Sequence, residues 1–271
     1  MPLETDANTP IRRYAFYVTV VVIIAMVGVT LRPYLPPVVF GWIGALSDRS
    51  IFGLVTMVGA WMALLDMAVQ FYRPTERVNA ILLLPVVTGL SGAIGVATCT
   101  IFTTATLVVA AITLLPLVLH PAGRSVLRFE RVALPNRLLV GLFAGGAIVL
   151  IVYGGQELEK QFTRTGEDAL TGGGYYGDLA IWSFSIALWG RLGVFRKRDW
   201  RFATWAAGVV ALFLGVGSTV FPDASSSLGQ VCGVLAAIWA IALVGMTEYV
   251  QGLSETSPVP SRNRSLAEYG P

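Results

Sequence analysis

The sequence predicts an all-α, polytopic integral membrane protein with about eight transmembrane helices. Of its 271 residues, 55% are hydrophobic and only 13% are charged, whereas soluble domains carry roughly 25% charged residues. The mean hydropathy is +0.70. Most of the chain lies in apolar runs near the length of about 20 residues that a helix needs to cross the hydrocarbon core. No polar segment is long enough to form a soluble domain.

Eight apolar runs follow one another along the chain. They comprise residues 14–31, 51–72, 78–98, 100–119, 138–153, 178–195, 202–221 and 228–249. At a rise of about 1.5 Å per residue, the stretch 78–119 is twice as long as one membrane span requires. We therefore expect two helices joined by a tight turn near Cys99. A second turn is expected at 222–227, where serines would cap the last helix.

The distribution of Lys and Arg predicts the orientation, because cytoplasmic connectors are enriched in both. With the N-terminus inside, fifteen of the 19 basic residues fall in inner segments. The outer segments then contain only Arg32, Arg49, Lys160 and Arg164. We therefore predict a protein of the cell membrane with both termini in the cytoplasm.

The whole chain, 1–271, is expected to form a single membrane domain. It would consist of a polar N-terminal arm (1–13), helices one to four (14–119), a basic cytoplasmic connector (120–137), helices five to eight (138–249) and a disordered C-terminal tail (250–271).

The two halves of this domain have similar connector lengths: long, short and short. A shift of 124 residues lays Phe71 and Arg77 over Phe195 and Arg201. This pattern fits a parallel four-plus-four duplication, an arrangement known from transporters. The alternative is that any eight-helix chain divides into two fours, and basic residues gather at inner ends in any case.

Asp66 is the best candidate for a functional residue inside a span, because an isolated carboxylate there is costly. Arg191 lies at a similar depth from the same face, so the two are predicted to pair. The pair would be a gate or a proton-linked carboxylate, or it would be purely structural, or Arg191 would extend to the lipid headgroups. Gln70 and Glu248 could join a polar cluster at the inner ends, where His120 is interpreted as an interfacial cap.

Threonines are frequent in the fourth span. The span contains Thr100, Thr103, Thr104, Thr106 and Thr113. The spacing places Thr100, Thr103 and Thr104, and by extension Thr106, on one broad face that could line a ligand or ion pathway. The alternative is that these hydroxyls bond to their own backbone or join neighbouring helices.

Two pairs of glycines spaced four apart, Gly141/Gly145 and Gly229/Gly233, predict close helix contacts. The contacts would form within the chain, with another membrane subunit or with a second copy. The remaining partner we expect is the lipid bilayer. No nucleic-acid partner is expected, because the basic residues are better explained as topology signals.

The chain has two cysteines outside any CxxC pattern and one histidine. We therefore expect no metal site and no haem or other cofactor held by this chain alone. No Ser/His/Asp set, HExxH motif or lysine within a span is present, which disfavours an enzyme. A transporter of small molecules or ions, or a subunit of one, is the function we favour. The alternative is a non-catalytic structural or assembly subunit of a larger membrane complex.

Overall fold

A computed structural model of the chain describes residues 10–31, 47–72, 74, 80–98, 103–121, 136–163, 174–195 and 200–256. Within these ranges the protein has eight α-helices and no β-strand. The helices are α1 (Pro10–Thr30), α3 (Ser47–Val69), α4 (Leu83–Thr98), α5 (Thr103–Leu119), α6 (Arg137–Thr163), α8 (Tyr175–Phe195), α9 (Trp200–Val220) and α10 (Gln230–Thr256). A short 3₁₀-helix, η4 (Ala80–Leu82), leads into α4.

Seven of the described helices are long and apolar enough to cross a membrane, and α5, with 17 residues, is a shorter apolar helix. Each predicted apolar run corresponds to one of these helices. The predicted all-α class is therefore confirmed for the described residues, and seven helices have the length and apolar composition that a membrane span requires. The turn expected near Cys99 lies outside the described residues.

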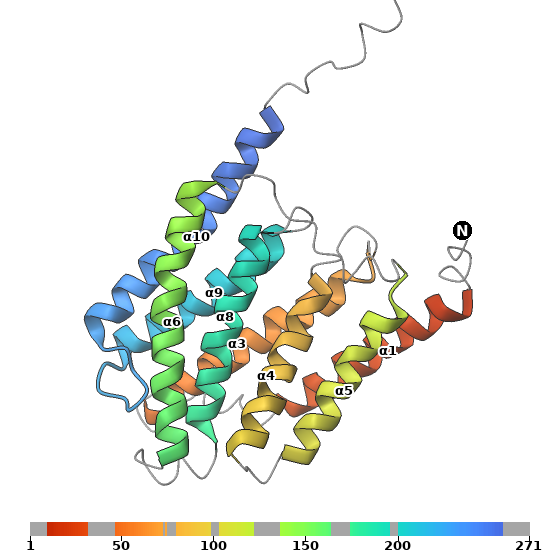
Figure 1. Cartoon of the computed structure of the whole chain (residues 1–271), viewed down its shortest axis with the longest axis horizontal. Helices are drawn as coiled ribbons and strands as arrows, with labels where there is room; N and C mark the ends of the chain where they lie inside the picture. The colour runs from red at the N-terminus through yellow and green to blue at the C-terminus, as the bar shows by residue number, and fades with distance from the viewer. Residues whose placement is uncertain are drawn as a thin grey trace, which may run out of the picture.

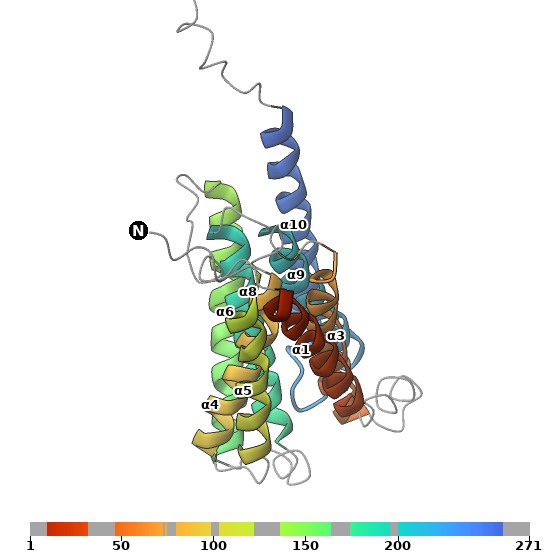
Figure 2. The ribbon, with the colours of Figure 1, turned by 90° about the vertical axis from the view of Figure 1, so that its right-hand side faces the viewer.

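The helices form two layers of four (Figures 1 and 2). One layer contains α6, α8, α4 and α5, and the other contains α10, α9, α3 and α1, with neighbours in each layer in contact. The exposed large apolar side chains lie mostly on the four corner helices, α1, α5, α6 and α10. Apolar side chains on the outside of the bundle suit contact with lipid rather than water.

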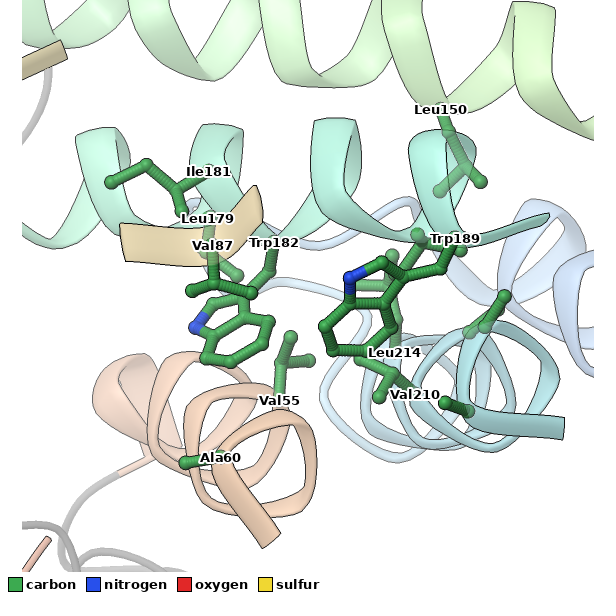
Figure 3. Packing of buried hydrophobic residues seen from close by; sticks show 14 of the residues in the cluster. Val55, Ala60, Val87, Leu150, Leu179, Ile181, Trp182, Trp189, Val210 and Leu214 are labelled. Atoms are coloured by element: carbon green, nitrogen blue, oxygen red, sulfur yellow. The ribbon is translucent and has the colours of Figure 1, made fainter. Parts of the chain in front are cut away.

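Helix α8 lies inside the array and contacts α6, α4, α9 and α3. Its side chains are buried on nearly all sides, as expected of a core helix. Trp182 and Trp189 pack edge to face with ring centroids 6.1 Å apart, among aliphatic side chains of the neighbouring helices (Figure 3). Trp182 donates a hydrogen bond to Thr56 Oγ1 on α3 at 3.0 Å, and Trp189 donates one to the Leu83 carbonyl on α4 at 3.1 Å.

The connection between α9 and α10 is a tight turn, as predicted, but its capping residue differs. The Gly229 carbonyl accepts the hydrogen bond from the Gly233 amide at 2.8 Å, so Gly229 is the cap of α10. Gly229 has φ = 77°, a left-handed conformation that favours glycine. Ser227 supports it by accepting the Gly229 amide at 2.9 Å. Ser227, one of the serines that the sequence predicts as the cap, therefore lies two residues before the cap and bonds to its amide.

Helices α9 and α10 approach most closely where Gly215 faces Gly233. A Cβ added at Gly215 would lie 2.6 Å from the Gly233 carbonyl oxygen and 2.6 Å from the Ala237 amide nitrogen. Backbone atoms cannot rotate away as a side chain can. Only glycine therefore permits the two backbones to come this close. Close backbone contact at small residues is typical of helix packing in membranes.

Gly215→Ala should destabilise the protein by about 1–3 kcal/mol, the usual cost of overpacking. The measurement is thermal unfolding of the purified protein in detergent. Gly28→Ala on α1 is the control, since a Cβ there meets no atom within 4 Å, and alanine is the better helix former. An equal fall in melting temperature for both variants would contradict this prediction.

Candidate functional site

Buried polar side chains identify candidate sites in a bundle of apolar helices, because burying them is costly unless they have a role. Two clusters of such side chains lie at opposite ends of the bundle. One is at the C-terminal ends of α3 and α5, and the other is at the C-terminal end of α6 (Figure 1).

The first, the histidine cluster, consists of Asp66, Gln70 and His120. All three side chains are fully buried. His120 Nε2 lies 3.4 Å from Gln70 Oε1, and Asp66 lies one turn earlier on α3. The Phe16 ring of α1 packs edge to face against the imidazole with centroids 5.2 Å apart. Three helices thus meet around a histidine that is a buried residue, not the interfacial cap that the sequence suggests.

Burial, reinforced by the positive charge of Arg12, lowers the pKa of His120 from 6.5 to about 4, although a hydrogen bond with the Pro74 backbone opposes this. The imidazole is therefore neutral at pH 7. Arg12 itself donates to the Val118 carbonyl at 2.8 Å, which ties the start of α1 to the end of α5.

The stability of the wild-type protein should fall as the pH is lowered from about 6.5 towards 4. In that window the unfolded chain protonates His120 and the folded protein does not, so protonation favours unfolding. His120→Gln retains a side chain that can form hydrogen bonds but removes the group that takes up the proton. The melting temperature of this variant in detergent should therefore depend less on pH between 7 and 4.5. Parallel pH curves for the two proteins would show that His120 titrates normally.

The second, the glutamate cluster, consists of Tyr153, Glu157, Lys160, Ser225 and Ser226. Glu157 is 1% exposed, and its Oε1 lies 2.6 Å from Lys160 Nζ. Its Oε2 accepts a hydrogen bond from Ser226 Oγ at 2.9 Å. Lys160 also donates to the Ser225 carbonyl at 2.8 Å, and Tyr153 donates to the Ser226 carbonyl at 2.6 Å. These bonds attach the α9–α10 connection to α6.

The glutamate cluster is absent from the sequence-based candidates, although a signal was present. Tyr153, Glu157 and Gln161 are spaced four apart and so share one face of a helix. Gln161 extends this polar face towards α8, where its Oε1 accepts the Gly177 amide at 3.2 Å. The predicted span ended at residue 153, whereas α6 continues to Thr163. The polar face therefore lies on the part of the helix that the apolar pattern does not cover.

The structure does not bring Asp66 and Arg191 together. Asp66 is fully buried on α3, and Arg191 is exposed on α8. The ion pairs between described side chains are Lys160–Glu157 and Arg201–Glu248. A similar depth in the membrane does not specify the face of the helix, which explains why the predicted pair does not form.

The other predicted residues are only partly described. Thr100 and the side chains of Thr103 and Thr104 lie outside the described residues, so the proposed pathway stays a prediction. Thr113 is buried and lies 2.7 Å from Thr88, hydroxyl to hydroxyl, which joins α5 to α4. Glu248 binds Arg201 and, at 2.7 Å, Trp205 Nε1 on α9, and does not join Gln70.

The predicted glycine pairs have different environments. Gly233 forms the close contact with α9, and Gly229 caps α10. Gly141 and Gly145, in contrast, are exposed, and a Cβ added at either would meet no atom within 4 Å. The α6 pair is therefore not used in packing among the described residues.

Two further features concern ligand binding. A largely apolar hollow of about 260 Å³ lies between α6, α9 and α10, with Tyr153 and Cys232 among its lining residues. No group of three or more His, Cys, Asp or Glu side chains within the described ranges is arranged to hold a metal ion. Comparison with protein-family models, curated proteins and solved structures found no match. The function must therefore be inferred from geometry.

Proposed function

We propose that this protein is a carrier of a small molecule or ion, or a subunit of one, built from two duplicated four-helix halves. The first half is α1, α3, α4 and α5, and the second is α6, α8, α9 and α10. The observation that supports this most directly is that the two halves have the same pattern of helix contacts.

In the first half, contacts run from α1 to α3, α3 to α4, α4 to α5 and α5 back to α1. In the second half they run from α6 to α8, α8 to α9, α9 to α10 and α10 back to α6. Each half is thus a closed ring with the same order. A rotation by half a turn about an axis along the bundle exchanges the two layers of Figure 1 and matches each helix with its equivalent.

The contacts between the halves follow the same symmetry. Helix α3 packs against α9, and its equivalent α8 packs against α4, the equivalent of α9. Helices α3 and α8, which are equivalent to each other, also touch. Parallel repeats related by an axis along the membrane normal occur in transporters, which bind substrate near the midplane between the repeats.

A candidate substrate region lies at this interface. Ser185 is at the centre of α8 and is fully buried. Its hydroxyl has no hydrogen-bond partner among the described residues. Trp182 and Thr56 bridge the halves one turn away. If the halves separate, these polar groups become available to a small polar ligand, whereas the tryptophans close the site in the present structure.

We also propose that all eight helices span the membrane, with both chain ends in the cytoplasm. Helix α1 begins and α10 ends at the same end of the bundle (Figure 1). The described arginine side chains lie at that end of their helices, namely Arg12, Arg13, Arg137, Arg191 and Arg201. Lys160 lies at the opposite end. This asymmetry supports placing the arginine-rich end in the cytoplasm.

A membrane-impermeant amine reagent applied to intact cells should modify Lys160 and leave Lys197 unmodified, as measured by peptide mass spectrometry. The wild-type reaction should be slow, because the Lys160 ammonium is bound to Glu157 and its side chain is only 33% exposed. Glu157→Gln should accelerate it, and Glu159→Gln, at an exposed position on the same helix, should not. Modification of Lys197 alone would reverse the proposed orientation.

Transport should require movement between the halves. A Cβ at Gly217 on α9 would lie 3.5 Å from the Ile51 Cγ1 and 3.8 Å from the Ile51 Cα on α3, so cysteines at these two positions are near enough for a disulfide to be tested. The double variant Ile51→Cys/Gly217→Cys, with Cys99 and Cys232 replaced by serine, should link the halves on oxidation. Uptake of a pooled panel of isotope-labelled metabolites and ions into liposomes should then stop, and reductant should restore it.

The control is a disulfide within one half. A Cβ at Gly208 would lie 3.9 Å from Val244 Cβ, so Gly208→Cys/Val244→Cys joins α9 to α10 without linking the halves. Its oxidation should leave uptake intact. Unchanged uptake after oxidation of the first pair would show that the halves do not move.

The alternative is a structural subunit, which the unused glycines Gly141 and Gly145 on the outer face of α6 favour. In that case gentle extraction from the native membrane should yield a stoichiometric partner protein, and no member of the panel should accumulate. A carrier complete in itself should be extracted alone or as a homo-oligomer.

A further inference from the structure

A groove of about 790 Å³ lies between the N-terminal part of α6 and the C-terminal part of α10. Gly141, Leu142, Gly245 and Met246 are among the residues that form its apolar floor, and Arg137 and Tyr249 lie at its mouth. We propose that this groove binds an anionic phospholipid from the leaflet at the arginine-rich end, with the phosphate at Arg137 and one acyl chain along the two glycines.

Trp239 anchors α10 on α6 next to the groove. Helix α10 runs obliquely across α6 (Figure 1), and the Trp239 ring occupies the space where a side chain on Gly146 would be. Its Nε1 donates to the Leu142 carbonyl at 2.8 Å, and Leu142 also lines the groove. Trp239 itself lines the separate hollow of about 260 Å³.

The mouth of the groove carries the positive charge of Arg137, which no described acidic side chain neutralises. Arg137 forms no ion pair or hydrogen bond with the described residues, whereas Arg201, at the same end, is bound to Glu248. A guanidinium binds phosphate oxygens in a bidentate manner. Arg137 is also the first residue of α6, where the helix dipole favours an anion. Tyr249 is 63% exposed beside it, as suits a residue at the headgroup level.

The floor of the groove has two glycines, without side chains, at the positions where the lipid acyl chain would lie. A Cβ added at Gly141 or Gly245 would meet no atom within 4 Å. Because no water is available in the hydrocarbon layer to fill such a space, it is occupied by an acyl chain or by protein.

The length of the groove favours lipid over a partner helix. On α10 its lining residues run from Ala242 to Tyr249, which is about 10 Å at a helical rise of about 1.5 Å per residue. A partner helix would need contact along much of a core about 30 Å thick, whereas a phospholipid reaches through one leaflet only.

The test is native mass spectrometry of the delipidated full-length protein, with phosphatidylglycerol or phosphatidylcholine of the same acyl chains added. Wild type should prefer phosphatidylglycerol by about tenfold, as expected for one charged hydrogen-bonded contact. Arg137→Gln should reduce this to the affinity for phosphatidylcholine, and Arg137→Lys should restore part of it. The double variant Gly141→Leu/Gly245→Leu should weaken binding of both lipids.

The matched controls are Arg191→Gln, an exposed arginine at the same end on α8, and Gly28→Leu, an equally open glycine on α1. Neither should change lipid binding. The proposal is overturned if wild type binds both lipids equally or if Arg191→Gln weakens binding as much as Arg137→Gln. It is also overturned if the leucine double variant still binds lipid and instead converts an oligomer to a monomer, because the groove would then be a helix interface.

Discussion

The packing of α8 at the centre of the bundle is the constraint on which the rest of this structure depends. In lipid, helices gain little from hiding apolar surface from each other, so shape and hydrogen bonds must hold them. Trp182 and Trp189 supply both, since their rings fill the centre of the bundle and their N–H groups reach α3 and α4. The second half of the chain is thereby attached to the first at its middle. Under the proposed carrier function, any movement of one half against the other would take place around these two side chains.

Two clusters of buried polar side chains lie at the ends of the bundle, away from this centre. The histidine cluster belongs to the first half and lies at one end, and the glutamate cluster belongs to the second half and lies at the other. Each joins elements within its own half, whereas Trp182 and Trp189 form hydrogen bonds across the halves. A buried ion pair such as Glu157–Lys160 adds little net stability in itself, but breaking it is costly. It therefore fixes the geometry of the α9–α10 connection.

The sequence was sufficient to predict the helices, because each apolar run is long and composition alone determines that it must be helical in lipid. It was insufficient wherever the outcome depends on the rotation of a helix about its axis. Asp66 and Arg191 were expected at a similar depth, but Asp66 is buried and Arg191 is exposed. The end of α6 was missed for a different reason: Glu157 and Lys160 are stabilised by Ser225 and Ser226, more than sixty residues away. The four-residue spacing of Tyr153, Glu157 and Gln161 was the one local sign of this polar helix face.

The proposed duplication also places the proposed lipid groove opposite an equivalent corner in the first half. On this equivalence α1 corresponds to α6 and α5 to α10, so the corner between α1 and α5 matches the corner that contains the groove. In the first half, Arg12 at the start of α1 donates to the Val118 carbonyl near the end of α5, which ties the two helices together. In the second half, Trp239 on α10 donates to the Leu142 carbonyl on α6, and Arg137 makes no bond to the described residues that would join the two helices at this end. The shift of 124 residues matches Arg137 with Arg13, the neighbour of Arg12. An arginine near the start of the first helix thus ties one corner together, whereas the arginine at the start of α6 is, in our proposal, available to a phosphate.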